Sequence, residues 1–175
     1  NILPTAFAIS LEQAKKLAGS NPNLSGQVNG LLGDAYNALK EYEKSDKAYD
    51  DALALNPDDD YVLNNYSYYL ALRKTNLEKA ETMSANLTKK HPDNAAYLDT
   101  YAWVLYQEGK YKEAKTVIEK TLALKDISAV HFEHYGDILY QLGNIDGAVA
   151  QWQKAKSLNG NNEALNKKIS DRKIH

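Results

Sequence analysis

The fold is decided by residues 129–162, AVHFEHYGDILYQLGNIDGAVAQWQKAKSLNGNN. Apolar residues recur there every three or four positions, on both sides of the helix-breaking pair Gly143-Asn144. This spacing is that of one face of an α-helix, so it predicts two helices joined by a short turn. The inward residues of the first helix are predicted to be Phe132, Tyr135, Ile138, Leu139 and Leu142, and those of the second Ile145, Ala148, Trp152, Ala155 and Leu158.

The same helix pair recurs upstream with a period of 34 or 35 residues, which is typical of a helical repeat array. Small residues mark the period, because two helices can approach closely only where their side chains are small. The first helices carry Gly33, Ser67, Ala102 and Gly136, and the second helices carry Ser45, Ala80, Ala114 and Ala148.

Prolines mark the period a second time. Pro22, Pro57 and Pro92 stand 35 residues apart, each in a short polar run. Since proline cannot continue a helix, each is predicted to separate two helices, and the Asp or Asn after it is predicted to cap the next one. In the last two repeats, Asp126 and Gly160 are predicted to break the helix instead.

These residues resemble the tetratricopeptide repeat family, which combines small residues at fixed positions with large apolar ones between them. The resemblance implies an all-α fold, a right-handed α-solenoid of antiparallel helix pairs with a C-terminal capping helix. Four residues depart from the family pattern and predict looser packing in the first two repeats: Asn29, Ser45, Ser84 and Thr121. The implied division is a partial repeat with its second helix only (1–25), four repeats (26–59, 60–94, 95–128 and 129–162) and a capping helix (163–175).

The two ends of the chain are expected to differ. Residues 162–172 form an amphipathic helix with Leu165 and Ile169 facing inward, which predicts a cap that shows a charged face to water. The first helix begins without a polar cap, so we expect the array to continue upstream of Asn1. Its apolar residues near the start are Ile2, Leu3 and Phe7.

Composition excludes several classes of function. The net charge is −2 without a basic stripe, which disfavours nucleic acid as the partner. The absence of cysteine excludes disulfides, thiolate zinc sites and thiol nucleophiles. No stretch approaches the roughly 18 consecutive apolar residues of a membrane helix. The compartment stays open between the cytoplasm and the bacterial envelope, whose tetratricopeptide lipoproteins this chain resembles in its Tyr, Asn and Asp content.

No catalytic motif is found in the sequence: there is no phosphate-binding glycine loop, nucleophile elbow or metalloprotease helix. His131 and His134 have a spacing compatible with a two-point metal site. They flank structural positions, however, and are expected at partly exposed sites without a metal. Asp58–Asp60 directly follow Pro57 and are expected to be cap residues rather than an acid/base pair. We therefore predict a non-enzymatic protein with no cofactor and no metal.

The resemblance implies that the first helices of successive repeats line a concave face. Large aromatic residues occur there at positions that the core does not require, together with amides and carboxylates. This mixture is typical of interaction hot spots. The predicted partner-binding residues are Tyr61, Asn64, Tyr68, Asp99, Trp103, Tyr106, Glu133, Asp137 and Tyr140.

The charge of this face restricts the ligand. It lacks the Lys and Arg residues with which some members of the family hold acidic tails, so we predict a neutral, apolar or basic ligand. The leading hypothesis is a protein-interaction scaffold that binds an extended peptide or a helix of a partner protein. The alternative hypothesis is a structural segment of a longer repeat protein, acting as a spacer or in self-association through its uncapped N-terminal side.

Overall fold

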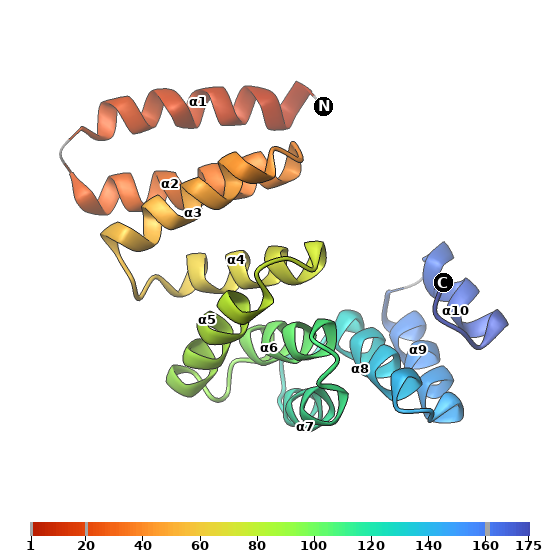
Figure 1. Ribbon diagram of the computed structural model, residues 1–175. Coiled ribbons are helices and arrows are strands. Elements are labelled where there is room, and N and C mark those ends of the chain that lie inside the picture. The colour runs from red at the N-terminus through yellow and green to blue at the C-terminus, as the bar shows by residue number, and fades with distance from the viewer. Residues whose placement is uncertain (1, 20, 160–161) are drawn as a thin grey trace. The chain divides into compact units, whose positions relative to one another are not determined.

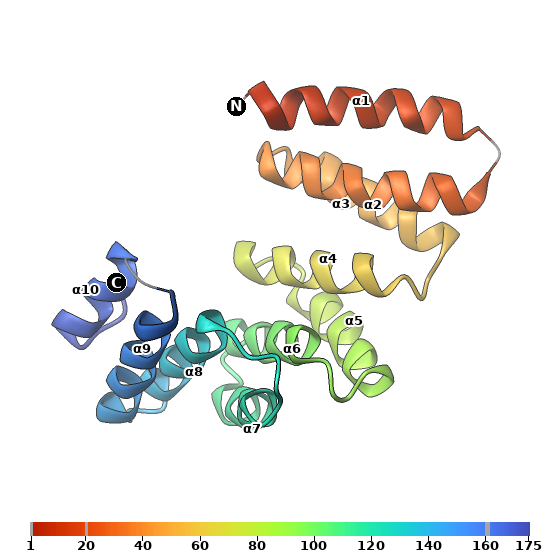
Figure 2. The same cartoon turned by 180° about the vertical axis from the view of Figure 1, so that it is seen from behind.

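The computed structural model describes residues 2–19, 21–159 and 162–175. Within these ranges the chain forms ten α-helices and no β-strand, which confirms the all-α prediction (Figures 1 and 2). Gly160 and the side chains of Ile2 and Leu3, on which predictions were made, lie outside what is described. The helices are α1 (Ile2–Ala18), α2 (Pro22–Ala38), α3 (Tyr42–Leu55), α4 (Asp60–Arg73), α5 (Leu77–Lys90), α6 (Ala95–Gln107), α7 (Tyr111–Leu122), α8 (Ala129–Gln141), α9 (Ile145–Asn159) and α10 (Glu163–Asp171).

The chain divides into two compact units, Asn1–Tyr69 and Leu70–His175, which we call unit 1 and unit 2. In unit 1, α2 packs against both α1 and α3, and the three helices lie side by side in both views (Figures 1 and 2). In unit 2, α6 packs against α5, α7 and α8, while α9 packs against α8 and α10. Each unit is thus built from antiparallel helix pairs, the construction of an α-solenoid.

Two of the three periodic prolines lie in turns between helices, as predicted. Pro57 follows the end of α3, and Asp59 Oδ1 accepts a hydrogen bond from the Val62 amide in the first turn of α4 at 3.1 Å. After Pro92, Asn94 accepts a hydrogen bond from the Tyr97 amide at 3.2 Å and caps α6. These side chains satisfy amides that a helix start would otherwise leave unpaired.

Pro22 stands at the boundary between α1 and α2, as predicted, but the prediction that the Asn after it caps the next helix is wrong. The proline is the first residue of α2, where a missing amide hydrogen leaves no helical bond unmade. The capping residue is Asn21, which precedes the proline and accepts a hydrogen bond from the Leu24 amide at 3.2 Å. As a result, α2 begins upstream of Gly26, where the first full repeat was predicted to begin.

The small residues of the repeat lie where paired helices touch. A Cβ atom built on Gly33 would stand 2.5 Å from the ring of Tyr49, and one on Gly136 would stand 2.4 Å from the ring of Trp152. Each glycine therefore lets a large ring of the second helix lie directly on the backbone of the first. The small second-helix residues are fully buried, as close approach requires: Ser45, Ala80, Ala114 and Ala148.

Three of the four polar residues that depart from the family pattern, Ser45, Ser84 and Thr121, are buried with their hydroxyls hydrogen-bonded. The fourth, Asn29, is buried with its side-chain Oδ1 lacking a hydrogen-bond partner among the described residues. The Ser45 hydroxyl donates to the Gly33 carbonyl at 2.8 Å, across the α2–α3 contact. Ser84 donates to the Ala80 carbonyl at 2.7 Å, and Thr121 donates to a carbonyl in its own helix. Because these hydroxyls have acceptors, their burial in the core costs little free energy. The looser packing predicted from these three residues is not seen, since all three are fully buried.

The last helix covers the last pair, as predicted for a capping helix. Leu165 of α10 is buried in one core cluster with Phe132 and Trp152, and Ile169 packs against the same cluster. No helix in the described ranges is both long and apolar enough to cross a membrane.

Candidate functional site

We call the side of α4, α6 and α8 that carries the predicted partner-binding residues, together with Asp34 of α2, the first-helix face, and we describe its parts in unit 1 and unit 2 separately. In unit 1 this face is organised around Asp34 of α2. Its carboxylate accepts hydrogen bonds from the hydroxyls of Tyr49 (2.5 Å) and Tyr61 and from the side-chain amide of Asn65 (3.2 Å). Tyr49 belongs to α3, whereas Tyr61 and Asn65 belong to α4. One carboxylate therefore joins three helices.

The two phenols of this cluster act as permanent donors. Burial and, after it, the hydrogen bond to Asp34 raise the pKa of Tyr49 and of Tyr61 above the ordinary value of 10.0. Tyr61 nevertheless keeps 47% of its surface exposed. Of the other predicted residues in unit 1, Asn64 and Tyr68 are half-buried, and the ring of Tyr68 lies 5.9 Å from that of Tyr69.

In unit 2 the face carries a stack of three rings centred on Trp103 of α6. The Tyr106 ring lies 4.6 Å from the Trp103 ring at 11°, and the His134 ring lies 4.1 Å from it at 16°. Two nearly parallel rings this close cannot share one face of the indole, because side by side they would overlap. They therefore cover its two faces and hold the half-buried Trp103 in one orientation.

His134, the third ring of this stack, forms a buried pair with Asp99. His134 Nδ1 lies 2.9 and 3.0 Å from the two carboxylate oxygens of Asp99. The expectation that the histidines are partly exposed is wrong, since both His131 and His134 are buried. The sequence could not show this, because the acceptor that makes burial of His134 tolerable lies 35 residues away.

His131 has a separate structural role. Its Nδ1 accepts a hydrogen bond from the Ser128 amide at 3.0 Å and completes a capping box at the start of α8. Burial lowers the pKa of His131 below its ordinary value of 6.5, which keeps the ring a neutral acceptor. In the part of the chain that is described, no three potential metal ligands come together.

The predicted acidic residues of α8 are paired with a cation from the capping helix. Lys168 Nζ donates to Glu133 Oε1 at 2.8 Å and to both oxygens of Asp137 at 2.8 and 2.9 Å. Trp152 Nε1 also donates to Asp137 at 2.9 Å. Burial opposes the charge of Lys168, but the two carboxylates outweigh it and raise the pKa of this lysine. Lys168 therefore compensates one of the two negative charges at this end of the face. The prediction that the polar side of α10 faces water missed this contact.

Three of these contacts share one spacing along the sequence. Asp34 and Asn65 are 31 residues apart, as are Asp137 and Lys168, and Trp103 and His134 have the same separation. The first member always follows the small residue that marks a first helix, and the second lies in the next first helix or in α10. We call these contacts the inter-repeat pairs.

The remaining predicted residues are half-buried. Tyr140 packs against the core cluster of unit 2, with its ring 6.0 Å from that of Trp152. The Tyr106 hydroxyl accepts a hydrogen bond from Gln141 Nε2 at 3.3 Å. On the first-helix face of unit 2, the half-exposed groups are therefore aromatic edges, phenol hydroxyls and amides, together with the Glu133 carboxylate.

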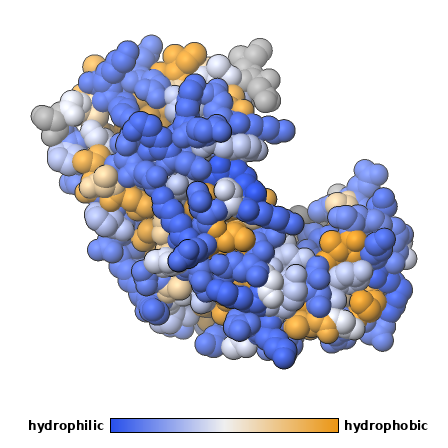
Figure 3. Space-filling model, in the orientation of Figure 1, coloured by the Kyte–Doolittle hydropathy of each residue, from blue (hydrophilic) through white to orange (hydrophobic). Residues whose placement is uncertain are grey.

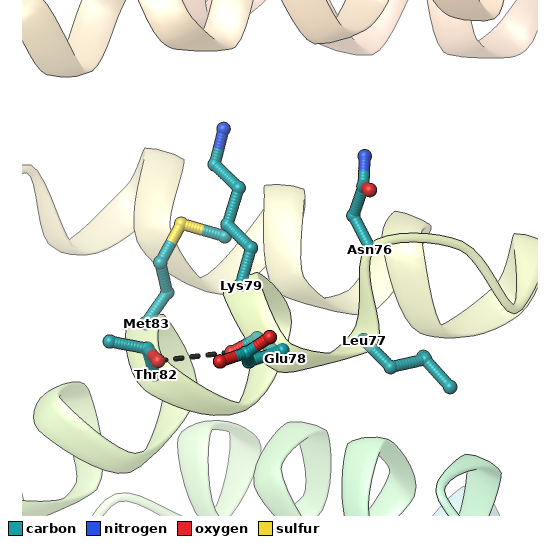
Figure 4. Close-up of a pocket in the computed structure, with 6 residues that line it drawn as sticks. All are labelled: Asn76, Leu77, Glu78, Lys79, Thr82 and Met83. Carbon is teal, nitrogen blue, oxygen red and sulfur yellow. Dashed lines mark hydrogen bonds between the residues drawn. The ribbon is translucent and has the colours of Figure 1, made fainter.

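Two hollows lie away from the predicted residues. One, of about 590 Å³, is lined by the start of α5, where Asn76 and Lys79 point to the same side and Thr82 donates to the Glu78 carbonyl (Figure 4). The other, of about 390 Å³, is lined mainly by aliphatic side chains, including Ile127 and Leu158. On the surface shown in Figure 3, hydrophobic side chains form small patches separated by hydrophilic ones.

Comparison with known sequences identifies the repeat. Two models described as tetratricopeptide repeat match the chain, one at residues 26–59 and one at residues 100–162. The TPR repeat-containing protein PA4667 of Pseudomonas aeruginosa is 30% identical over 95 residues. That match covers 54% of this chain but only 16% of the relative, so the chain corresponds to a small part of that protein.

Solved structures show the same fold. PilW, a type IV pilus biogenesis factor, is similar with a TM-score of 0.79 at 19% identity, over 94% of this chain and 76% of that one. YrrB, described as a TPR protein with an unusual peptide-binding site, has a TM-score of 0.70 at 13% identity, over 94% and 81%. The fold and the repeats are those of scaffolds that bind other proteins. The chain belongs to the tetratricopeptide repeat family.

Proposed function

We propose that this chain is a non-enzymatic scaffold whose first-helix face binds an extended peptide or a helix of a partner protein. The observation that carries the proposal is the ring stack of Trp103. Aromatic side chains already held in one orientation lose little conformational freedom when a ligand binds, so they make efficient anchors. The core of the repeat does not require rings at this position, since Asp34 and Asp137 occupy it elsewhere.

Two kinds of residue act in the proposed site. Tyr106, Tyr140 and the edge of Trp103 supply apolar contact, and Gln141 supplies an amide for the backbone of the ligand. Asp99 and Asp137 position their neighbours, because their carboxylates are occupied by His134 and Lys168. The ligand recognised in unit 2 is therefore neutral or apolar. In unit 1 the proposed contacts are Tyr61, Asn64 and Tyr68, and in unit 2 Glu133 adds a partly exposed carboxylate. The resemblance to YrrB supports a peptide ligand.

The test uses a displayed library of random linear peptides and the whole chain as bait. A selected peptide is expected to bind Tyr106→Ala about 30-fold more weakly than wild type, the loss of a typical hot-spot side chain. Tyr42→Ala serves as the matched control, because Tyr42 is an exposed tyrosine on the second helix α3. Its affinity should stay within about twofold. Failure to select any peptide, or equal affinities of both variants, would contradict the proposal.

The alternative, self-association, has an observation in its favour. The outer side of α1 exposes Ile9 and Leu17, with 87% of Leu17 accessible, while Ala8 and Leu11 are buried against α2. Light scattering over a concentration series decides this alternative. Self-association is supported if the molar mass of the wild type rises with concentration and that of Leu17→Glu does not. It is excluded if the wild type is a monomer at every concentration.

A further inference from the structure

We propose that Asp34 binds a basic side chain of the polypeptide that the first-helix face binds. The group bound is a lysine ammonium or an arginine guanidinium. The inference rests on the proposed function, since Asp34 is bonded to Tyr61 on that face. It adds the chemical class of one ligand group in unit 1, whereas the ring stack of unit 2 recognises neutral or apolar groups.

The first argument is the charge balance of Asp34. Its three hydrogen-bond donors are the neutral side chains of Tyr49, Tyr61 and Asn65. The raised pKa values of both tyrosines keep them neutral. Among the described residues of unit 1, the ion pairs formed by lysines go to Asp51 and Glu41, and none goes to Asp34. A half-exposed carboxylate with neutral donors alone attracts a cation.

The second argument is that the chain holds a cation in the same geometry elsewhere. Asp34 and Asp137 each follow a glycine onto which a ring of the second helix packs, and that ring side chain donates to the carboxylate in both cases. The residue 31 positions later completes each cluster. It is an amide at Asn65 and an ammonium at Lys168. The arrangement around Asp137 therefore shows that this geometry accepts an ammonium at 2.8 Å.

The third argument is the position of the Tyr61 ring. A Cβ atom built on Gly30, one turn before Asp34, would lie 3.8 Å from two atoms of this ring, so the ring rests on the backbone of α2. Tyr61 keeps 47% of its surface exposed, so a ligand side chain can approach the ring and the carboxylate to which its hydroxyl donates.

The count of acceptor sites indicates how the cation binds. A carboxylate accepts about four hydrogen bonds, two on each oxygen. Tyr49 and Asn65 use Oδ1, and Tyr61 uses one site of Oδ2. One site on Oδ2 is left, so the contact is with a single N–H. Arginine then has no bidentate advantage, and we expect lysine and arginine to bind with similar strength.

The first experiment reads the sequence preference of peptides selected on the whole chain. Selected peptides are expected to contain Lys or Arg at a fixed position, and its replacement by Gln should weaken binding to wild type about tenfold. The same replacement should have no effect on binding to Asp34→Asn. Glu43→Gln is the matched control, since Glu43 is an exposed carboxylate on α3, and it should behave as wild type. The inference is overturned if the selected peptides depend on Tyr106 but contain no basic residue at a fixed position. It is also overturned if the preference for a basic residue is unchanged in Asp34→Asn. Either result leaves the proposed function standing.

The second experiment has a stability readout that needs no ligand and a binding readout that uses the selected peptide. Asn65→Lys places an ammonium 31 residues after Asp34, as Lys168 stands after Asp137. We expect its Tm to rise by about 2–4 °C and its affinity for the basic peptide to fall about tenfold. Both effects should vanish when Asp34→Asn is added. A Tm that does not rise, or that rises equally in the Asp34→Asn background, overturns the inference even if no peptide is ever selected.

Discussion

Replacing Lys168 with methionine is expected to loosen the capping helix. Methionine keeps most of the length and apolar contact of the lysine stem but removes its charge. The loss is therefore electrostatic, and its size follows from the burial of the group. The side chain of Lys168 is 16% exposed, and that of Asp137 is only 6% exposed. Without the ammonium, Asp137 keeps a single donor, Trp152 Nε1, and Glu133 keeps none among the contacts seen here.

Removing one member of a buried ion pair typically costs about 3–5 kcal/mol, because the other charge is left without compensation. Partial exposure of Lys168 reduces this value, so we expect a loss of about 2–4 kcal/mol in the free energy of unfolding. For a chain of this size such a loss lowers the Tm by about 5–15 °C. In a repeat array the effect should be largest next to the change, in α10 and α9.

Guanidinium denaturation followed by circular dichroism measures the loss, and amide hydrogen exchange locates it. Lys167→Met is the matched control, since Lys167 is an exposed neighbour on the same helix, and it should change stability by less than about 0.5 kcal/mol. Adding Asp137→Asn to Lys168→Met should restore at least about 1 kcal/mol, because it removes the uncompensated charge. If Lys168→Met unfolds like Lys167→Met, the ion pair does not hold α10 in solution and the reasoning is refuted.

Two further substitutions test the helix contacts and the buried cap. Gly33→Ala should destabilise the protein by about 1–2 kcal/mol, since overpacking against the fixed Tyr49 ring outweighs the better helix propensity of alanine. Gly26→Ala on the same helix, where a Cβ atom meets its nearest neighbour at 3.8 Å, should instead stabilise it, and chemical denaturation compares the two. His131 has a lowered folded pKa, so the unfolded state binds the proton first and stability falls as the pH drops below 6.5. His131→Gln keeps a capping-box side chain beside Ser128 and should flatten this part of the stability–pH curve; an unchanged slope would exclude His131 as its source.

The fold could be predicted because its determinants are local and periodic. The size of a residue and its helical spacing can be read directly, which is why Gly33 and Gly136 marked the close contacts correctly. The prediction of the cap failed at Pro22 because the same residue type suits both a turn and the first position of a helix. Asn21 decides between these two positions, because it caps α2 and thereby makes Pro22 the first residue of the helix.

The candidate site was harder to predict because its polar groups are paired across repeats. The helical position of Asp99 and Asp137 predicted a solvent-facing side, but both residues are buried. Their position in the sequence gave no information on the partners that bury them, His134 and Lys168. Those partners lie 31 to 35 residues away. The sequence does contain one signal, a spacing of 31 residues counted from the residue that follows a small-residue marker, and it could have linked Asp137 to Lys168.

The inter-repeat pairs also have a consequence for how the chain assembles. Helix pairs with one fold have similar surfaces, so an unfolded chain could dock them in the wrong order, a known failure of repeat proteins. Here the junctions differ in chemistry: carboxylate with amide at Asp34, indole with imidazole at Trp103, and carboxylate with ammonium at Asp137. Docking α10 beside Trp103 would leave the buried Asp137 without its cation and Trp103 without the ring of His134. Side-chain chemistry, in addition to the covalent chain, thus specifies the order of the helix pairs. Incorrect neighbours are disfavoured because they would leave a buried charge without a partner.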